Sequence, residues 1–177
     1  MTRTMFDSVN PAAIPHGAQM VAGYLNGNYA WSAAAWRQFA HITTIRIDVI
    51  GNSPLDAGIL DVEKGDATPH QATGWVKKRI AAGFRASVYC NRSTWPAVKA
   101  ACQGLNVSYW IADWTHVPHK LPGAVAVQWT SGTAFDTSAV YDNTWHPSRP
   151  SHAAVPTWLE QARTHADALT TLLHGNE

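Results

Sequence analysis

Short apolar segments recur through residues 1–146, and many of them end in a polar or acidic residue. Segments of this length, bounded by turn residues, are typical of buried β-strands. Helical stretches separate several of them, which favours a parallel sheet, and the number of strands favours closure of that sheet into a barrel. The expected strands are residues 4–7, 19–25, 42–49, 57–63, 84–90, 107–113, 124–130 and 138–143.

The connections between these strands include three expected helices, at residues 33–40, 68–82 and 95–102. In the second, Pro69 stands in the first turn and Gly83 follows the end, as is usual for helix termini. A (β/α)8 barrel normally needs about 250 residues and at least about 200. The predicted fold class is therefore α/β, as a small, trimmed (β/α)8 TIM-like barrel that lacks some helices. An open doubly wound sheet is the alternative.

The composition changes after the last expected strand, where a Pro-rich stretch at residues 147–155 predicts a linker. Residues 156–177 then have the pattern of an amphipathic helix, with Trp158 and Leu169 on its apolar face. We therefore expect a barrel over residues 1–146 followed by this linker and helix. The helix either packs back onto the barrel or docks elsewhere, which would make the chain a homo-oligomer or part of a larger assembly.

Charge and hydropathy argue against two classes of partner. Charged residues make up only 14% of the chain, the formal net charge is +1, and Lys and Arg form no stripe that could follow a nucleic-acid backbone. No apolar run approaches the roughly 20 residues that span a bilayer. The sequence also has no glycine-rich phosphate-binding loop. We expect no nucleic acid, no membrane and no cofactor.

Cysteine and tryptophan usage adds two further expectations. Cys90 ends an expected strand and Cys102 stands at the far end of the helix that follows, and a helix of about ten residues is roughly 15 Å long. This is too far for a disulfide, so we expect two free thiols. Nine Trp residues are far more than ordinary usage. Some of these rings are expected to be exposed, as surfaces on which sugars stack.

The segment Ile59-Leu-Asp61-Val-Glu63 is the most informative for function, because apolar residues lead into two carboxylates spaced i, i+2. Side chains at that spacing leave the same face of a strand. Repulsion and partial burial raise the pKa of one member of such a pair, which a general acid requires at neutral pH. We expect Glu63 to be the proton donor and Asp61 to orient substrate or stabilise charge. The alternative is an exposed strand end that enters a turn.

Further acidic residues stand at the ends of other expected strands. Asp7 ends the first, Asp48 the third, Asp113 the sixth and Asp142 the eighth. In a parallel barrel the carboxyl ends of the strands meet at one rim, where active sites lie. We therefore expect these acids to converge on one site.

At these positions the sequence resembles the family-25 glycoside hydrolases, which are lysozyme-type muramidases. Asp7-Ser8 resembles their Asp-x-Ser start, and Leu-Asp-Val-Glu at 60–63 resembles their Asp-x-Glu on strand four. Tyr-Trp-Ile-Ala at 109–112 is similar to their Trp-Ile-Ala strand, Val-Gln-Trp-Thr-Ser at 127–131 to their Gln-Tyr-Ser strand, and Val-Tyr-Asp-Asn at 140–143 to their closing Asp-x-Asn. The order is also similar to that of a related actinobacterial and phage group of glycoside-hydrolase-like barrels.

The resemblance implies hydrolysis of the β-1,4 bond between N-acetylmuramic acid and N-acetylglucosamine, with bacterial cell-wall glycan as the partner. It implies Glu63 as the proton donor and Asp61 as the residue that orients the acetamido group or stabilises the transition state, with Asp7 and Asp142 completing an acidic floor. A carboxylate or the substrate's acetamido group would be the nucleophile. The residues implied or expected to line sugar subsites are Asp48, Tyr89, Trp110, Asp113, Gln128 and Trp129.

Other interpretations remain open at this point. The same scaffold could be a non-catalytic module that binds cell-wall glycan or forms part of a phage virion. His116 and His119 are the only close histidine pair and a weak zinc candidate, so no metal is expected, and Cys90 is a weak nucleophile candidate. No signal-peptide pattern is visible at the N-terminus. We therefore expect synthesis in the cytoplasm and action at the cell wall, with a phage as the suspected source.

Overall fold

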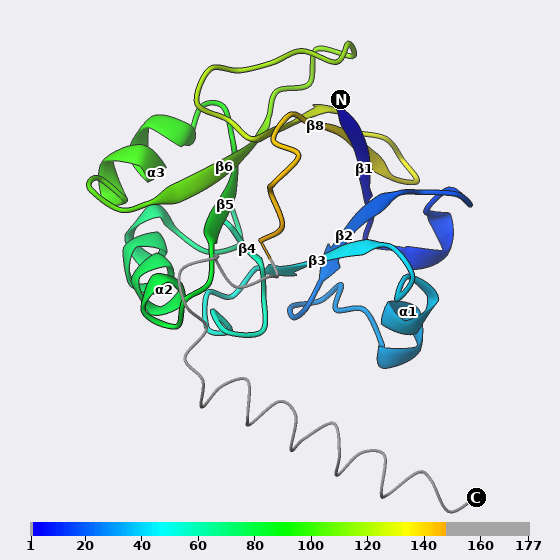
Figure 1. Cartoon of the computed structure of the whole chain (residues 1–177), viewed down its shortest axis with the longest axis horizontal. Helices are drawn as coiled ribbons and strands as arrows, with labels where there is room; N and C mark the ends of the chain where they lie inside the picture. The colour runs from blue at the N-terminus through cyan, green and yellow to red at the C-terminus, as the bar shows by residue number, and fades with distance from the viewer. Residues whose placement is uncertain (1, 148–177) are drawn as a thin grey trace, which may run out of the picture.

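The computed structural model describes residues 2–147, in which eight strands close into a barrel (Figure 1). The strands are β1 (Arg3–Asp7), β2 (Met20–Tyr24), β3 (Thr43–Asp48), β4 (Ile59–Asp61), β5 (Ala86–Asn91), β6 (Val107–Ala112), β7 (Ala126–Thr130) and β8 (Asp136–Val140). Their order around the ring is their order in the chain. Neighbours from β1 to β7 are parallel, whereas β8 is antiparallel to both β7 and β1. The predicted closed barrel is confirmed, and the open sheet is wrong.

The direction of β8 follows from the short connection that precedes it. Only residues 131–135 separate β7 from β8, whereas parallel strands need a crossover of a dozen or more residues. In the register, Gln128 lies opposite Ser138 and Asp7 lies opposite Asp136. β8 therefore begins at the end of the barrel where the other strands finish. The expected strand at 138–143 was placed too late in the chain, and the expectation that all strands end at one rim is wrong.

Within residues 2–147, three α-helices lie on the outside of the barrel, all within the ranges expected from the sequence. The helices are α1 (Ala33–Gln38), α2 (Pro69–Ala81) and α3 (Trp95–Ala101), with a short 3-10 helix η1 (Pro11–Ala13) after β1. Ser32 caps α1 by accepting a hydrogen bond from the backbone N–H of Ala35 at 3.1 Å. Thr68 and Gln71 form a reciprocal capping box at the start of α2. The β3–β4 and β6–β7 connections contain no helix, which explains how eight strands fit into so short a chain.

Apolar side chains pack in one cluster inside the barrel and two outside it. Fully buried Met5, Met20 and Ile45 belong to the inner cluster. Outside, residues of α2 and α3 pack against β4, β5 and β6 in one cluster, and α1 packs against β2 in the other. The ring of Trp31 lies so close over Gly23 that a Cβ there would approach ring atoms within 2.6 Å. A glycine on β2 is therefore what allows this tryptophan to cover the strand.

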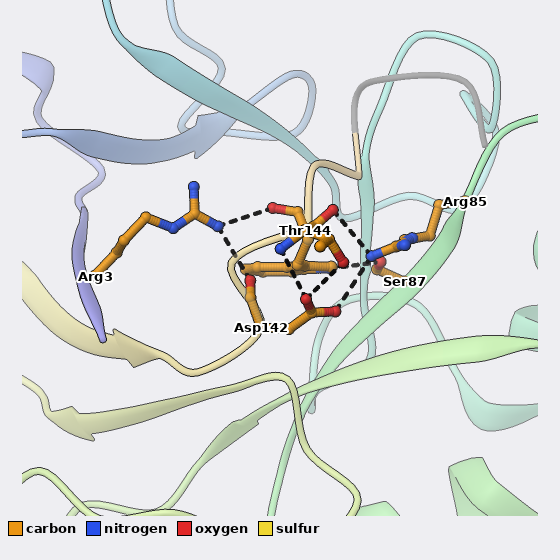
Figure 2. A network of polar contacts seen from close by, with 6 residues as sticks. Arg3, Arg85, Ser87, Asp142 and Thr144 are labelled. Carbon is orange, nitrogen blue, oxygen red and sulfur yellow. Dashed lines mark hydrogen bonds and ion pairs between the residues drawn. The ribbon is translucent and has the colours of Figure 1, made fainter. Parts of the chain in front are cut away.

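The end of the barrel where β1–β7 begin is closed by residues 141–147, here called the closing segment, which crosses the ring of strands after β8 (Figure 1, orange). Trp145 is completely buried in the inner cluster, and its Nε1–H donates to the Ser87 hydroxyl on β5 at 3.0 Å. Arg3 donates to the carbonyl oxygens of Asp142 and Trp145 at 3.2 and 3.1 Å (Figure 2). The closing segment thus plugs this end with one large aromatic side chain.

The buried side chain of Arg79 on α2 holds Pro147, at the end of the closing segment. The Arg79 guanidinium is 1% exposed and donates to the backbone carbonyls of Pro54, Ala57, Arg85 and Pro147. Burial lowers the pKa of Arg79 to about 10, a value at which the side chain still carries its charge at neutral pH. Four carbonyl dipoles therefore take the place of a carboxylate partner around this cation.

Apart from Pro147, the predicted linker at 147–155 and the predicted helix at 156–177 lie outside the described residues. Within residues 2–147 no helix is long and apolar enough to cross a membrane. Cys90 and Cys102 are both buried and free.

We predict that Trp145→Ala lowers the free energy of unfolding by about 3–5 kcal/mol, because it leaves a cavity in the barrel and an unpartnered Ser87 hydroxyl. Urea denaturation followed by circular dichroism measures the loss. Trp114→Ala is the matched control, since the Trp114 side chain is 53% exposed and its removal should cost about 1 kcal/mol or less. Equal losses in the two variants would contradict the role assigned to the closing segment.

Candidate functional site

A cavity of about 700 Å³ opens at the other end of the barrel, where β1–β7 finish and β8 begins. This is the end at which barrel enzymes of the parallel type hold their active sites. Each of the eight strands contributes a residue to its lining. The acidic and aromatic side chains of the lining, together with Gln128, are Asp7, Tyr24, Tyr29, Asp61, Glu63, Asp66, Tyr89, Trp110, Trp114, Gln128 and Asp136.

Five carboxyl groups meet in this cavity. Asp7 comes from the end of β1 and Asp61 from the end of β4, with Glu63 two residues beyond Asp61 and Asp66 in the following turn. Asp136 comes from the first position of β8, directly opposite Asp7 in the register. The predicted convergence of Asp7, Asp61 and Glu63 is confirmed as a placement in one cavity.

The Asp61 carboxyl group is buried and incompletely hydrogen-bonded within the part of the chain that the structure describes. The residue is 4% exposed, and its Oδ1 has no hydrogen-bond partner among the described residues. A buried oxygen in that state costs free energy, since it has lost its water and gained nothing in exchange. The side chain lines the cavity, so a bound molecule with a hydrogen-bond donor could satisfy it.

Gln128 connects the aromatic and acidic parts of the cavity. Its Oε1 accepts hydrogen bonds from the Tyr89 hydroxyl at 2.9 Å and from Trp114 Nε1 at 2.8 Å. Because both of these groups donate, the Nε2 side of the amide faces the acids, and it donates to Asp7 Oδ2 at 3.1 Å and Asp136 Oδ2 at 3.3 Å. One amide thus holds the two carboxyl groups of neighbouring strands side by side.

The electrostatics of the cavity favour protonated carboxyl groups. Burial raises the pKa of Asp7 to about 8, and repulsion from Asp136 adds to the rise while the hydrogen bond from Gln128 opposes it. Burial also raises the pKa of Asp61 well above its ordinary value, with repulsion from Glu63 as the next cause. Asp7 therefore holds a proton near neutral pH when the cavity is empty, and burial favours the protonated form of Asp61 in the same way.

Glu63 and Asp136 are less buried and differ in their surroundings. Burial raises the pKa of Glu63, and the neighbouring Asp66 and Asp136 carboxylates raise it further. Burial raises the pKa of Asp136 as well, but the backbone N–H of Gly132 donates to its Oδ1 at 2.8 Å and acts in the opposite direction. Glu63 is thus suited to hold a proton, and Asp136 is better suited to carry a charge.

Aromatic rings form the floor and the mouth of the cavity. Tyr89 and Trp110 pack at 4.5 Å between ring centroids and are both buried, as floor residues. Trp110 Nε1 donates to the Ser138 hydroxyl at 2.9 Å, which fixes the ring. At the mouth, Tyr29 and Trp114 are 59% and 53% exposed. The expected exposed ring surfaces are therefore present beside the carboxyl groups.

The structure corrects the predicted position of Asp142. It lies in the closing segment at the far end of the barrel, where Arg85 Nη1 forms an ion pair with its Oδ2 at 3.3 Å (Figure 2). Although partial burial acts to raise its pKa, hydrogen bonds from Thr144 and the charge of Arg85 bring the pKa below the ordinary value. The prediction failed because β8 runs antiparallel, so the end of this strand points away from the cavity.

Asp48 is also structural rather than part of the cavity. Its side chain is completely buried and accepts hydrogen bonds from Asn26 at 2.8 Å, from Trp75 Nε1 at 2.9 Å and from backbone amides of the turn at 50–53. Burial acts to raise the pKa of Asp48, but these hydrogen bonds lower it below the ordinary value. It organises the β3–β4 connection and has no oxygen left for a substrate.

Asp113 and Trp129 do not line the cavity either. Asp113 Oδ2 pairs with Arg92 at 2.7 Å and with His119 Nε2 at 2.9 Å, outside the cavity. Trp129 follows Gln128 on β7, where the register with β8 is irregular, and its side chain is not part of the cavity lining. The predicted subsite residues Tyr89, Trp110 and Gln128 do line the cavity.

Asp136 and Asp66 are the acidic residues that the sequence analysis missed. The signal for Asp136 was available, because the five residues between β7 and β8 are too few for a parallel crossover and imply a hairpin. A hairpin brings the start of β8, and therefore Asp136, to the end of the barrel that holds Asp7. Asp66 lies in a turn after Glu63, where an acidic residue is unremarkable, and no sequence signal separated it from a surface aspartate.

The structure gives no support to a zinc site at His116 and His119 or to Cys90 as a nucleophile. Both His119 ring nitrogens take part in hydrogen bonds, to Asp113 on one side and to Thr115 and Val117 on the other. Across residues 2–147 no group of three or more His, Cys, Asp and Glu side chains is arranged to hold a metal ion. Burial raises the pKa of Cys90 to about 12, which keeps this thiol protonated and unreactive.

We predict that Asp7→Asn makes the protein more stable at neutral pH. Unfolded Asp7 loses its proton near pH 4, whereas the folded residue keeps it up to about pH 8, so stability falls as pH rises through this window. The variant lacks that loss, and its stability relative to the native protein should grow from near zero at pH 4 to as much as about 4 kcal/mol at pH 7.

Urea denaturation from pH 4 to pH 8 measures this difference. Asp56→Asn is the control, because Asp56 is exposed and lies outside the cavity. A difference between Asp7→Asn and the native protein that does not change with pH would show that Asp7 ionises normally.

The chemistry of the cavity has to be inferred from its own residues. Searches against protein-family models, curated proteins and solved structures found no match for this chain.

Proposed function

We propose that the protein is a muramidase-like glycoside hydrolase that cleaves β-1,4 bonds between N-acetylmuramic acid and N-acetylglucosamine in bacterial cell-wall glycan. The observation that carries the proposal is the placement of Glu63, half-buried and with a raised pKa, in one cavity with Asp7, Asp61 and Asp136. Glycoside hydrolysis uses two carboxyl groups in different environments, one protonated and one ionised. The sequence motifs around Asp7, Asp61 and Glu63 support the same reaction class.

Glu63 is the proposed general acid. Its raised pKa keeps a proton available for the glycosidic oxygen, and its partial exposure leaves it accessible to a bound substrate. Asp136 is the proposed counterpart that carries negative charge, because Gly132 and Gln128 donate hydrogen bonds to its two oxygens. It would stabilise the positive charge that develops on the sugar ring or guide the attacking water.

Asp7 and Asp61 would act through their unusual pKa values. When the cavity is empty their protonated forms are favoured, because burial penalises their charged forms. Positive charge on an oxocarbenium-like transition state would favour their ionised forms, so their interaction with the substrate would strengthen as the reaction proceeds. Interactions that are stronger in the transition state than in the ground state are those that accelerate a reaction.

The fold and the cavity mouth are consistent with a polymeric sugar substrate. We interpret the barrel as a reduced (β/α)8 barrel of the TIM type, in which only three connections keep an α-helix and β8 is reversed. Tyr29 and Trp114 present exposed rings on which sugar units can stack. A reduced rim leaves the cavity open, as a long glycan strand requires.

We predict that Glu63→Gln lowers the release of reducing sugar from purified peptidoglycan by about 100-fold or more, because the amide cannot donate the proton. Asp142→Asn is the control, since Asp142 lies at the opposite end of the barrel, and its activity per folded molecule should match the native protein. Both variants are compared after circular dichroism has verified their folding.

Two outcomes would contradict the proposal. Full activity of Glu63→Gln would show that Glu63 is not the general acid. An inactive native protein that still co-sediments with peptidoglycan would make the barrel a glycan-binding module without catalysis.

A further inference from the structure

The cavity holds a large excess of acidic groups. Five carboxyl groups line it, and no Lys, Arg or His is found among the described residues of the lining. Arg92, a cation near this end of the barrel, is paired with Asp113 outside the lining. Within residues 2–147, therefore, no side-chain cation of the lining balances whatever charge these groups carry.

Burial and crowding both affect the ionisation of these carboxyl groups. Asp7, Asp61, Glu63, Asp66 and Asp136 all have raised pKa values, with burial as the first cause in each case. For Asp7, Asp61 and Glu63, repulsion from other acids of the cavity adds to burial. A positive charge brought into the cavity would interact favourably with several of these groups at once.

Asp61 provides a specific place for such a charge. Its Oδ1 is buried and has no hydrogen-bond partner among the residues that the structure describes, and the side chain lines the cavity. Glu63 lies two residues further along the chain, on the same lining. An ammonium group has three N–H donors and no acceptor, so it can satisfy neighbouring carboxylate oxygens without adding an unpaired acceptor.

We propose that the cavity binds glycans that carry free amino groups, and that a protonated glucosamine unit held at Asp61 is preferred over its N-acetylated counterpart. The inference rests on the proposed function for the choice of a sugar as ligand. Charge decides the preference, since an acetamido group is neutral and offers a single N–H. The favoured substrate class is therefore partly de-N-acetylated cell-wall glycan.

Binding of two matched tetrasaccharides tests the proposal. Isothermal titration calorimetry at pH 6 compares a glucosamine tetramer with an N-acetylglucosamine tetramer, using the intact chain. We expect the glucosamine tetramer to bind at least about tenfold more tightly, with a preference that shrinks as salt is added. In Asp61→Asn the preference should fall to about twofold or less, whereas Asp56→Asn, on an exposed residue outside the cavity, should keep it.

A second variant guards against misfolding of the first. Asp66→Asn removes an exposed carboxyl group that lines the cavity, and it should reduce the preference without disturbing the barrel. Equal or weaker binding of the glucosamine tetramer, absence of its binding, or an unchanged preference in both variants would overturn the proposal. These outcomes are independent of catalysis, because a protein that fails to cleave peptidoglycan can still show the preference, and a muramidase can lack it.

Discussion

β8 forms hydrogen bonds with β7 on one side and with β1 on the other, and without this double ladder the barrel would be an open sheet with two exposed edges. The structure of both ends of the barrel depends on the pairing and direction of β8. At one end, the reversed strand brings Asp136 opposite Asp7, where the Gln128 amide bonds to both. At the other end, the same strand leads into the closing segment, where Trp145 fills the barrel. A single strand direction therefore determines the composition of the cavity and the sealing of the core.

The buried carboxyl groups of the cavity cost the protein stability. Carboxyl groups such as Asp7 and Asp61 are buried in a cavity whose lining, within residues 2–147, has no Lys, Arg or His. Each of them makes the fold less stable as pH rises from its unfolded-state pKa towards its raised folded-state pKa. The inner cluster, the Tyr89–Trp110 pair and the bonds to Gln128 hold these groups in place nonetheless. Stability lost in this way is typical of sites built to interact with something that the protein itself does not contain.

Much of the fold could be predicted from the sequence, because short apolar strands and well-capped helices are encoded locally. The strand ends were predicted well enough to place Asp7, Asp61 and Glu63 in one cavity. What local patterns did not reveal was direction, since an apolar run looks the same in a parallel and an antiparallel strand. That ambiguity led to the choice of Asp142 over Asp136. Asp48 failed for another reason: its five hydrogen bonds depend on residues such as Trp75 that only the folded chain brings near.

The closing segment also has a mechanical consequence. The chain continues beyond Pro147 from the pole of the barrel that faces away from the cavity, so whatever follows it does not start at the mouth. A pulling force applied beyond Pro147 would first meet the Arg79 bonds to backbone carbonyls and then the Trp145 plug before it reached β8. There it would meet a strand that is paired on both sides. The barrel can thus be held from one pole while the cavity at the other pole stays accessible.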